Sequence, residues 1–329
     1  MKRLLVGLVV IGLISPLTAQ DKPAAGEAKP AKKPRLPIYN EKIDGQTLVN
    51  IAVAKAAKDN RRVLIQWGHN ECSWCYILHD VFRKEREVAR LIQYEYDVVN
   101  VDVGDPKSNE ELRKKYKFDY KDGVPYLTIL DGDGKLVVNQ ATGPLEIPKE
   151  KSTKASYDIP KVVDFLKKHA AKPLVAKEVL ASAAAKAKSE NKIVFLHFGA
   201  PWCGWCHHLE DWMAQSSVAS LLGKDFIDCK IDTDRTTGGK ELLKEHCKEE
   251  GGIPWFTFLD ESGKSLADSG PGRNNIGFPS TDKEIDAFIA LLKKAKRRLT
   301  DDDVAAIAAS LKAYREKTTS RRAPIAGTD

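Results

Sequence analysis

The sequence predicts an α/β fold made of two copies of one unit, each a mixed central sheet with helices on both faces. The repeat is visible in the spacing: Cys72 and Cys203 are 131 residues apart, and Pro125 and Pro254 are 129 apart. In each copy, helical and strand-like segments alternate before two final strands joined by a tight turn. The alternation of helices and strands favours parallel strands, and the tight turn favours an antiparallel pair. The sheet is therefore expected to be mixed.

Length and composition fit a globular protein of two domains. The chain has 329 residues, of which 42% are hydrophobic and 8% aromatic, and this length is large for a single core. The net charge of +7 is concentrated at the two ends, in residues 20–35 and 293–329. Because the body shows no basic face with interleaved aromatic residues, we expect no nucleic-acid partner.

The first residues are typical of a secretory signal peptide. Two basic residues precede an apolar run at 4–17, and the small Ala19 offers a cleavage site. The run is shorter than the ~20 residues of a spanning helix and contains a proline. We predict a signal peptide at residues 1–19, no integral membrane segment after its cleavage, and a periplasmic or secreted location. Residues 20–38, rich in proline and lysine, are expected to form a linker.

Each unit, predicted at residues 39–172 and 173–299, begins with an alanine-rich helix and an apolar strand. The helices are expected in TLVNIAVAKAAKDN and LVAKEVLASAAAKAKSEN, and the strands in RVLIQWG and KIVFLHFG. A C-x-x-C pair follows each strand directly. Apolar residues at helical spacing come next, so a helix should begin at each cysteine pair. These residues are Leu78, Val81, Phe82, Val88, Leu91 and Ile92 in the first unit, and Leu209, Trp212, Met213, Ala219 and Leu222 in the second.

The remaining elements of each unit are a further strand, a charged helix, a hairpin and a last helix. The hairpin turns are DGDG and DESG, and the last helices are expected near residues 158–170 and 281–297. Residues 300–329 are predicted to hold a capped helix and, from residue 317, a disordered tail. The helix should pack on its own domain, with another subunit as the alternative, through an apolar stripe of Val304, Ile307, Leu311 and Tyr314.

The two C-x-x-C pairs carry the predicted chemistry. At a helix N-terminus, unpaired backbone N–H groups and the positive end of the macrodipole favour thiolate over thiol. Thiolate is the nucleophile of disulfide exchange, and a cysteine three positions on lies on the same helix face. Cys72 and Cys203 are therefore the predicted nucleophiles, with Cys75 and Cys206 as the resolving thiols.

Two prolines complete a resemblance to a known family. DGVPYLTIL and GGIPWFTFL place Pro125 and Pro254 at the start of an apolar strand, where a proline cannot complete the ladder. Together with the C-x-x-C pairs, these segments resemble the thioredoxin superfamily over nearly all of residues 40–297, twice. The resemblance implies cis prolines packed against the cysteine pairs. It also implies that the backbone at Val124 and Ile253 pairs with an extended substrate chain.

The sequence departs from the family pattern at two places. Glu71 stands where the second unit has Trp202, and its carboxylate should disfavour the neighbouring thiolate, so Cys203 is predicted to have the lower pKa of the two nucleophiles. Thioredoxins carry a buried aspartate six residues before the first cysteine, where this chain has Gln66 and His197. His197 is either a hydrogen-bonded core histidine or a proton-transfer residue.

Other interpretations of the cysteines stay open at this point. The string CGWCH at residues 203–207 matches a c-type haem attachment site, although the first unit has Tyr76 where the histidine would be. A zinc site that includes His208 would also need the adjacent His207. Neighbouring side chains on a helix diverge by about 100°, so a closed tetrahedral site would be strained. Cys229 and Cys247 have the pattern of core residues, and a disulfide between them is the alternative. We expect neither a cofactor nor a metal.

The resemblance, together with the predicted signal peptide, implies an exported thiol-disulfide oxidoreductase that acts on protein disulfides. Its expected partners are extended or partly unfolded polypeptides with disulfides or thiols, and an unidentified redox partner. The alternative is a polypeptide-binding or chaperone-like module whose disulfides are structural. The direction of electron flow depends on reduction potential, which spans roughly 150 mV among related dithiols.

Overall fold

Two mixed four-stranded sheets with flanking helices make up the part of the chain that the structure describes, which confirms the predicted fold class. The predicted signal peptide, the linker before residue 35 and residues 323–329 of the predicted tail lie outside it. The described residues from Pro37 onward form one compact unit. The computed structural model describes residues 35–148, 150, 152, 155–247, 251–270 and 274–322.

The first sheet has the strand order β2-β1-β3-β4. β2 is parallel to β1, β3 is antiparallel to β1, and β4 is antiparallel to β3. The strands are β1 (Arg62–Gly68), β2 (Tyr96–Asp102), β3 (Tyr126–Leu130) and β4 (Leu136–Ala141). The helices are α1 (Gly45–Lys58), α2 (Ser73–Lys84), α3 (Arg86–Glu95), α4 (Glu110–Lys115) and α5 (Ile159–His169), with 3-10 turns at Tyr120–Asp122 and Gly143–Leu145.

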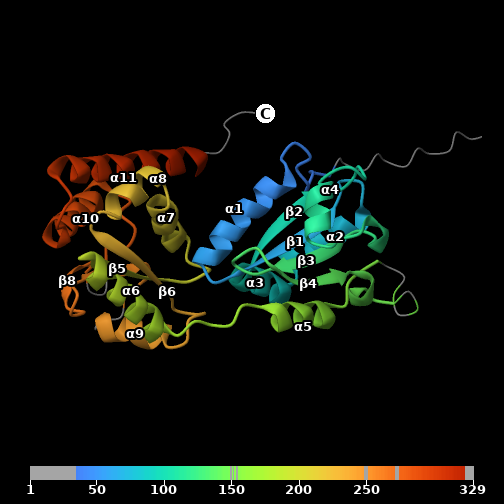
Figure 1. Cartoon of the computed structure of the whole chain (residues 1–329), viewed down its shortest axis with the longest axis horizontal. Coiled ribbons are helices and arrows are strands. Elements are labelled where there is room, and N and C mark those ends of the chain that lie inside the picture. The colour runs from blue at the N-terminus through green and yellow to red at the C-terminus, as the bar shows by residue number, and fades with distance from the viewer. Residues whose placement is uncertain are drawn as a thin grey trace, which may run out of the picture. The chain divides into compact units, whose positions relative to one another are not determined.

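Alternating side chains of β1 belong to two different cores. Val63, Ile65 and Trp67 pack with residues of α1 and α4 on one face of the sheet. Leu64 packs with residues of α2, α3 and α5 on the other face. Figure 1 shows α1 and α5 on opposite sides of this sheet. β1 is therefore buried on both faces, and the first cysteine pair follows its carboxyl end.

The second sheet repeats this topology with the strand order β6-β5-β7-β8. β6 is parallel to β5, whereas β7 and β8 are antiparallel to their neighbours. The strands are β5 (Ile193–Gly199), β6 (Phe226–Asp232), β7 (Trp255–Leu259) and β8 (Ser265–Asp268). The helices are α6 (Ala176–Glu190), α7 (Gly204–Met213), α8 (Ser216–Leu222), α9 (Gly239–His246), α10 (Asp282–Ala295) and α11 (Asp301–Arg322).

The helix that follows each cysteine pair is interrupted. In the first half the apolar positions from Leu78 to Ile92 are shared by α2 and α3, because Glu85 between them is extended, with φ −78° and ψ 112°. In the second half Gln215 is likewise extended and separates α7 from α8. Helical spacing in the sequence continues across both interruptions, so the pattern did not reveal them.

Helix α11 packs on the second half, as predicted. Val304, Ile307 and Leu311 are buried in one core with Trp212 of α7 and Phe288 of α10. Figure 1 shows α11 alongside α8 and α10. The predicted start of the tail was wrong, since the helix continues past residue 317 to Arg322.

Candidate functional site

The first cysteine pair lies at the start of α2. Cys72 is the N-cap residue of this helix, and its Sγ accepts a hydrogen bond from the backbone N–H of Cys75 at 3.1 Å. The two residues form a disulfide, with Cys72 half-buried and Cys75 fully buried. The outer sulfur thus lies among the unpaired N–H groups of a helix N-terminus, which is where a thiolate is stabilised.

The second pair has the same geometry at the start of α7. Cys203 is the N-cap residue, and its Sγ accepts from the backbone N–H of Cys206 at 3.1 Å. These two residues also form a disulfide, and Cys203 is 4% exposed. Trp202 and Trp205 beside it are 56% and 48% exposed, so the second pair is more enclosed than the first and is bordered by exposed indole rings.

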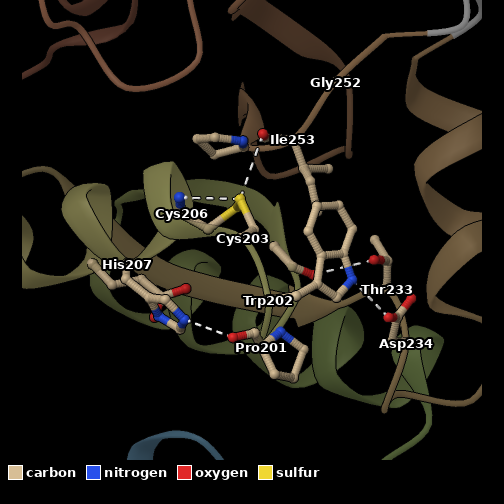
Figure 2. The surroundings of a disulfide bond; sticks show 12 residues. Pro201, Trp202, Cys203, Cys206, His207, Thr233, Asp234, Gly252 and Ile253 are labelled. Carbon is tan, nitrogen blue, oxygen red and sulfur yellow. Dashed lines mark hydrogen bonds and ion pairs between the residues drawn. A yellow bond between two sulfur atoms is a disulfide. The ribbon is translucent and has the colours of Figure 1, made fainter. Parts of the chain in front are cut away.

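A cis proline faces each pair, as the resemblance implies. The Val124–Pro125 and Ile253–Pro254 peptide bonds are both cis. Cys72 Sγ lies 3.8 Å from the carbonyl oxygen of the first of these bonds, and Cys203 Sγ lies 3.5 Å from that of the second. Figure 2 shows the second arrangement, with Ile253 opposite the sulfur. Substrate binding by these four residues stays a prediction.

The positions six residues before each nucleophile hold different groups. Gln66 is fully buried, and its Nε2 donates to the backbone carbonyl of Cys75 at 3.1 Å. His197 is 1% exposed, and its Nε2 lies 2.8 Å from Asp228 Oδ1 on the parallel strand β6. His197 is therefore a hydrogen-bonded buried histidine, and proton transfer through it stays a prediction.

A carboxylate beside the second resolving cysteine was not found from the sequence. A methyl group on Gly199 would lie 3.4 Å from Glu210 Oε1 and 3.5 Å from Cys206 Sγ, so both atoms border this glycine. Glu210 Oε2 bonds to Lys230 Nζ at 2.8 Å. Burial raises the pKa of Glu210, but its interaction with His207 and the charge of Lys230 outweigh burial and lower that pKa to about 2. The one sequence signal was a charged residue one turn after Cys206, on the apolar side of the helix.

A phenol beside the first resolving cysteine was also missed. Tyr39 is 2% exposed, and a methyl group on Gly68 would overlap both its hydroxyl oxygen and Cys75 Sγ. Gln66 Nε2 donates to the same hydroxyl oxygen at 2.7 Å. Tyr39 directly follows the proline-rich segment, and nothing in that pattern indicates contact with a cysteine 36 residues later.

The histidine of the CGWCH string is bonded within the protein. His207 Nε2 lies 2.9 Å from the carbonyl oxygen of Pro201, as Figure 2 shows. The Glu210 carboxylate, 3.8 Å from His207 Nδ1, raises the pKa of His207 in spite of partial burial. Across the described ranges, no group of three or more His, Cys, Asp or Glu side chains is arranged to hold a metal ion. No disulfide joins Cys229 to Cys247, and Cys229 is buried in the sheet core.

Two family models match the chain. The model described as "Thioredoxin-like" matches residues 46–132. The model named Thioredox_DsbH and described as "Protein of unknown function, DUF255" matches residues 159–313. The matches fall on different halves of the chain, and each includes one cysteine pair.

Individual relatives cover parts of the chain. Protein disulfide-isomerase erp38 of Neurospora crassa is 25% identical over 219 residues, which are 66% of this chain and 55% of that protein. Spermatogenesis-associated protein 20 of Homo sapiens is 40% identical over 50 residues, 15% of this chain and 6% of that protein. The chain thus spans less than two thirds of either relative. A disulphide isomerase from Xylella fastidiosa Temecula1 has a solved structure with 27% identity and a TM-score of 0.34, covering 40% of this chain and 95% of that one.

Of the helices described, none is both long enough and apolar enough to cross a membrane.

Proposed function

The chain belongs to the thioredoxin superfamily, and from that premise we propose that it is an exported thiol-disulfide oxidoreductase acting on protein disulfides. The observation that carries the proposal is the position of Cys72 and Cys203. Each is the N-cap residue of a helix, and each has its sulfur facing the carbonyl that precedes a cis proline. A structural disulfide has no need of this arrangement at both sites.

Reduction of a substrate disulfide proceeds in two exchanges. The Cys72 or Cys203 thiolate attacks one substrate sulfur, so that a mixed disulfide forms, the substrate S–S bond breaks, and the other substrate sulfur leaves as a thiolate and takes up a proton. The resolving thiolate of Cys75 or Cys206 then attacks its partner cysteine and releases the second substrate thiol. Two electrons pass to the substrate, and the enzyme is left with its own disulfide. An external dithiol reductant restores it, and the reverse sequence oxidises a substrate.

The helix N-terminus supplies the thiolate stabilisation that this chemistry needs. The backbone N–H groups of Cys75 and Cys206 already point at the outer sulfurs, both at 3.1 Å. A negative charge on these sulfurs strengthens such hydrogen bonds and interacts favourably with the helix dipole. The outer cysteine of each pair is therefore the one that attacks substrate.

The partners that suit these sites are extended or partly unfolded polypeptides. An extended chain pairs with backbone at Val124 and Ile253, next to the cis prolines. At the second site the exposed rings of Trp202 and Trp205 add apolar contact area beside an outer sulfur that is largely enclosed. The signal peptide predicted at residues 1–19 supports a periplasmic or secreted location, where disulfides form and persist.

Mixed-disulfide trapping tests the proposal. Replacing the resolving cysteine stops the second exchange, so full-length Cys75→Ala and Cys206→Ala variants, with the remaining cysteine of that pair reduced, should accumulate mixed disulfides with a partly unfolded substrate protein that carries disulfides. The matched control is Cys229→Ala, which removes a buried cysteine outside both pairs and should trap nothing. If neither resolving-cysteine variant trapped substrate, the pairs would be structural and the chain a binding module.

A further inference from the structure

Tyr39 is a buried titratable residue beside the first cysteine pair. The two exchange steps described above do not use it. Its backbone N–H donates to Asn70 Oδ1 at 3.1 Å, and Asn70 Nδ2 donates back to its carbonyl oxygen at 3.1 Å. These two bonds fix the segment before α1 against the loop that leads to Cys72. The phenol ring is thereby held inside the domain, with its hydroxyl oxygen and Cys75 Sγ both against Gly68.

Gln66 is a hydrogen-bond donor to the Tyr39 hydroxyl, so the hydroxyl proton does not point toward it. Its side-chain nitrogen lies 2.7 Å from the Tyr39 hydroxyl oxygen and 3.1 Å from the carbonyl oxygen of Cys75. Because a carbonyl can only accept, the atom of Gln66 that faces it must be the NH2 group. The Tyr39 oxygen therefore accepts a hydrogen bond from Gln66, and its own proton remains to be donated elsewhere. A Cβ added to Gly68 would lie 2.5 Å from Cys75 Sγ and closer still to this oxygen, so the hydroxyl and the sulfur border the same small space.

We propose that in the reduced protein the Tyr39 hydroxyl donates a hydrogen bond to Cys75 Sγ and stabilises the thiolate that resolves the mixed disulfide at this site. The inference rests on the proposed function. In the step itself the Cys75 thiolate attacks Cys72 Sγ, the Cys72–Cys75 bond forms, and the bond from Cys72 to the substrate sulfur breaks. The substrate sulfur leaves as a thiolate and takes up the proton that the Cys75 thiol gave to solvent.

Tyr39 keeps its own proton throughout this step. Burial raises the pKa of the Tyr39 hydroxyl well above its usual value, and the bond from Gln66 only partly opposes this. The phenol is thus a neutral donor. Hydrogen bonds to a charged group are the strong ones, so the hydroxyl favours thiolate over thiol at Cys75. The other titratable groups that act on Tyr39 are Asp102, Tyr76 and Tyr157.

The second site offers the opposite environment to its resolving thiol. There the group that shares a glycine with the resolving sulfur is the Glu210 carboxylate, whose charge repels a thiolate, although its ion pair with Lys230 reduces the effect. The two resolving thiols therefore have different partners in an otherwise repeated site. On this proposal Tyr39 favours the resolving thiolate at the first site, whereas Glu210 disfavours it at the second.

The test follows both exchanges with 5,5′-dithiobis(2-nitrobenzoate), in the full chain with Cys203, Cys206 and Cys247 replaced by serine. Attack by Cys72 releases one thionitrobenzoate, and resolution by Cys75 releases the second. Tyr39→Phe should leave the first release unchanged and slow the second about tenfold at neutral pH. The pH midpoint of the second release should rise by about one unit. Asp102, Tyr76 and Tyr157 are the same in both proteins, so they do not produce this shift.

The control is Tyr96→Phe, which also removes a buried phenol hydroxyl in this half, one that donates to the Leu166 carbonyl at 2.6 Å. It should lower the melting temperature without changing the rate or the pH midpoint of the second release. The proposal for Tyr39 is overturned if Tyr39→Phe leaves the rate of the second release within twofold of the parent and its pH midpoint unchanged, or slows both releases equally. If the parent itself never releases the second thionitrobenzoate, the proposed function fails at this site, a result distinct from failure of the Tyr39 proposal.

Discussion

The outer cysteines share one backbone setting but differ in the side chains beside them. Both are N-cap residues that accept a hydrogen bond from the backbone N–H three positions on. The preceding residue is Glu71 in the first half and Trp202 in the second. Glu71 is bonded to His69 Nδ1 at 3.1 Å, and its side chain is 80% exposed. Solvent therefore weakens its effect on Cys72 but does not abolish it.

The Cys203 thiol is predicted to be more acidic than the Cys72 thiol. Glu71→Gln should lower the pKa of the Cys72 thiol by less than about one unit, because even two unit charges about 4 Å apart in water interact by only about 1 kcal/mol. Ultraviolet absorbance of thiolate, followed against pH in variants that keep one pair, measures both groups. The pKa of the Cys203 thiol is the control and should not change with Glu71→Gln. A Cys72 thiol more acidic than that of Cys203 before the substitution would contradict the prediction.

The buried Glu210–Lys230 pair makes stability depend on pH. The folded pKa of Glu210 is about 2, against an ordinary value of 4.5. The carboxylate therefore stabilises the fold above pH 4.5, and this contribution, on the order of 3 kcal/mol, is lost as the pH falls toward 2. Glu210→Gln should lower the free energy of unfolding at pH 7 and flatten its dependence on pH in that window.

Urea unfolding at a series of pH values measures this effect. Glu241→Gln is the control, because Glu241 is exposed on α9 and should leave the pH dependence as it is. If the free energy of unfolding changed equally with pH in Glu210→Gln and in the parent protein, the Glu210–Lys230 pair would contribute nothing to acid stability.

The sequence predicted the cysteines and prolines but not the groups beside the resolving sulfurs. Cys72 and Cys203 could be placed because a strand followed by C-x-x-C and helical spacing is a local pattern. Glu210 and Tyr39 could not, because their roles depend on which side chains the tertiary structure brings to Gly199 and Gly68. Strand alternation in β5 left the direction of His197 open, and the structure gives its partner as Asp228.

The presence of the helices was easier to predict from the sequence than their lengths. The cysteine-bearing helices begin where the strand pattern ends, but the interruptions at Glu85 and Gln215 involve single extended residues. Apolar residues on both sides of each interruption still face one core, so the periodicity is preserved across it. The apolar stripe predicted that α11 exists but did not indicate where it ends, and the helix extends beyond residue 317.

Helix α11 is predicted to stabilise the second half through its buried stripe. Ile307 is fully buried in the core that α11 shares with residues of α7, α8 and α10. Ile307→Ala should lower the free energy of unfolding by about 2–4 kcal/mol through lost burial and the cavity left behind. Urea unfolding of the full chain measures it. Lys312→Ala, at an exposed position of the same helix, should change stability by no more than about 0.5 kcal/mol, and equal effects of the two substitutions would mean that α11 is not packed as described.

Across the chain, the repeat made the overall architecture predictable. Equivalent strands and cysteine pairs appear in the same order in both halves, and the two sheets share one topology. The residue boundaries 39–172 and 173–299 stay predictions. The two halves differ in the side chains that surround their cysteine pairs. The spacing of the repeat does not predict these differences.

Export is the prediction that concerns the N-terminal residues. Expressed in a bacterium with a secretory pathway, the full chain should be recovered from the periplasm with Gln20 as its first residue, because the small Ala19 precedes the cleavage site. Intact-mass measurement of the purified protein identifies the first residue. A chain recovered with residues 1–19 still attached would contradict the predicted cleavage.

Redox equilibrium of both pairs is the most direct test of catalysis by the two C-x-x-C sites. The full chain is equilibrated with glutathione and dithiothreitol buffers, the thiols are blocked, and mass spectrometry determines the redox state of Cys72–Cys75 and Cys203–Cys206. Each pair should titrate reversibly with a midpoint between roughly −270 and −120 mV, the range of redox-active dithiols. A pair that stays oxidised below about −300 mV, as structural disulfides do, would contradict the account for that half of the chain.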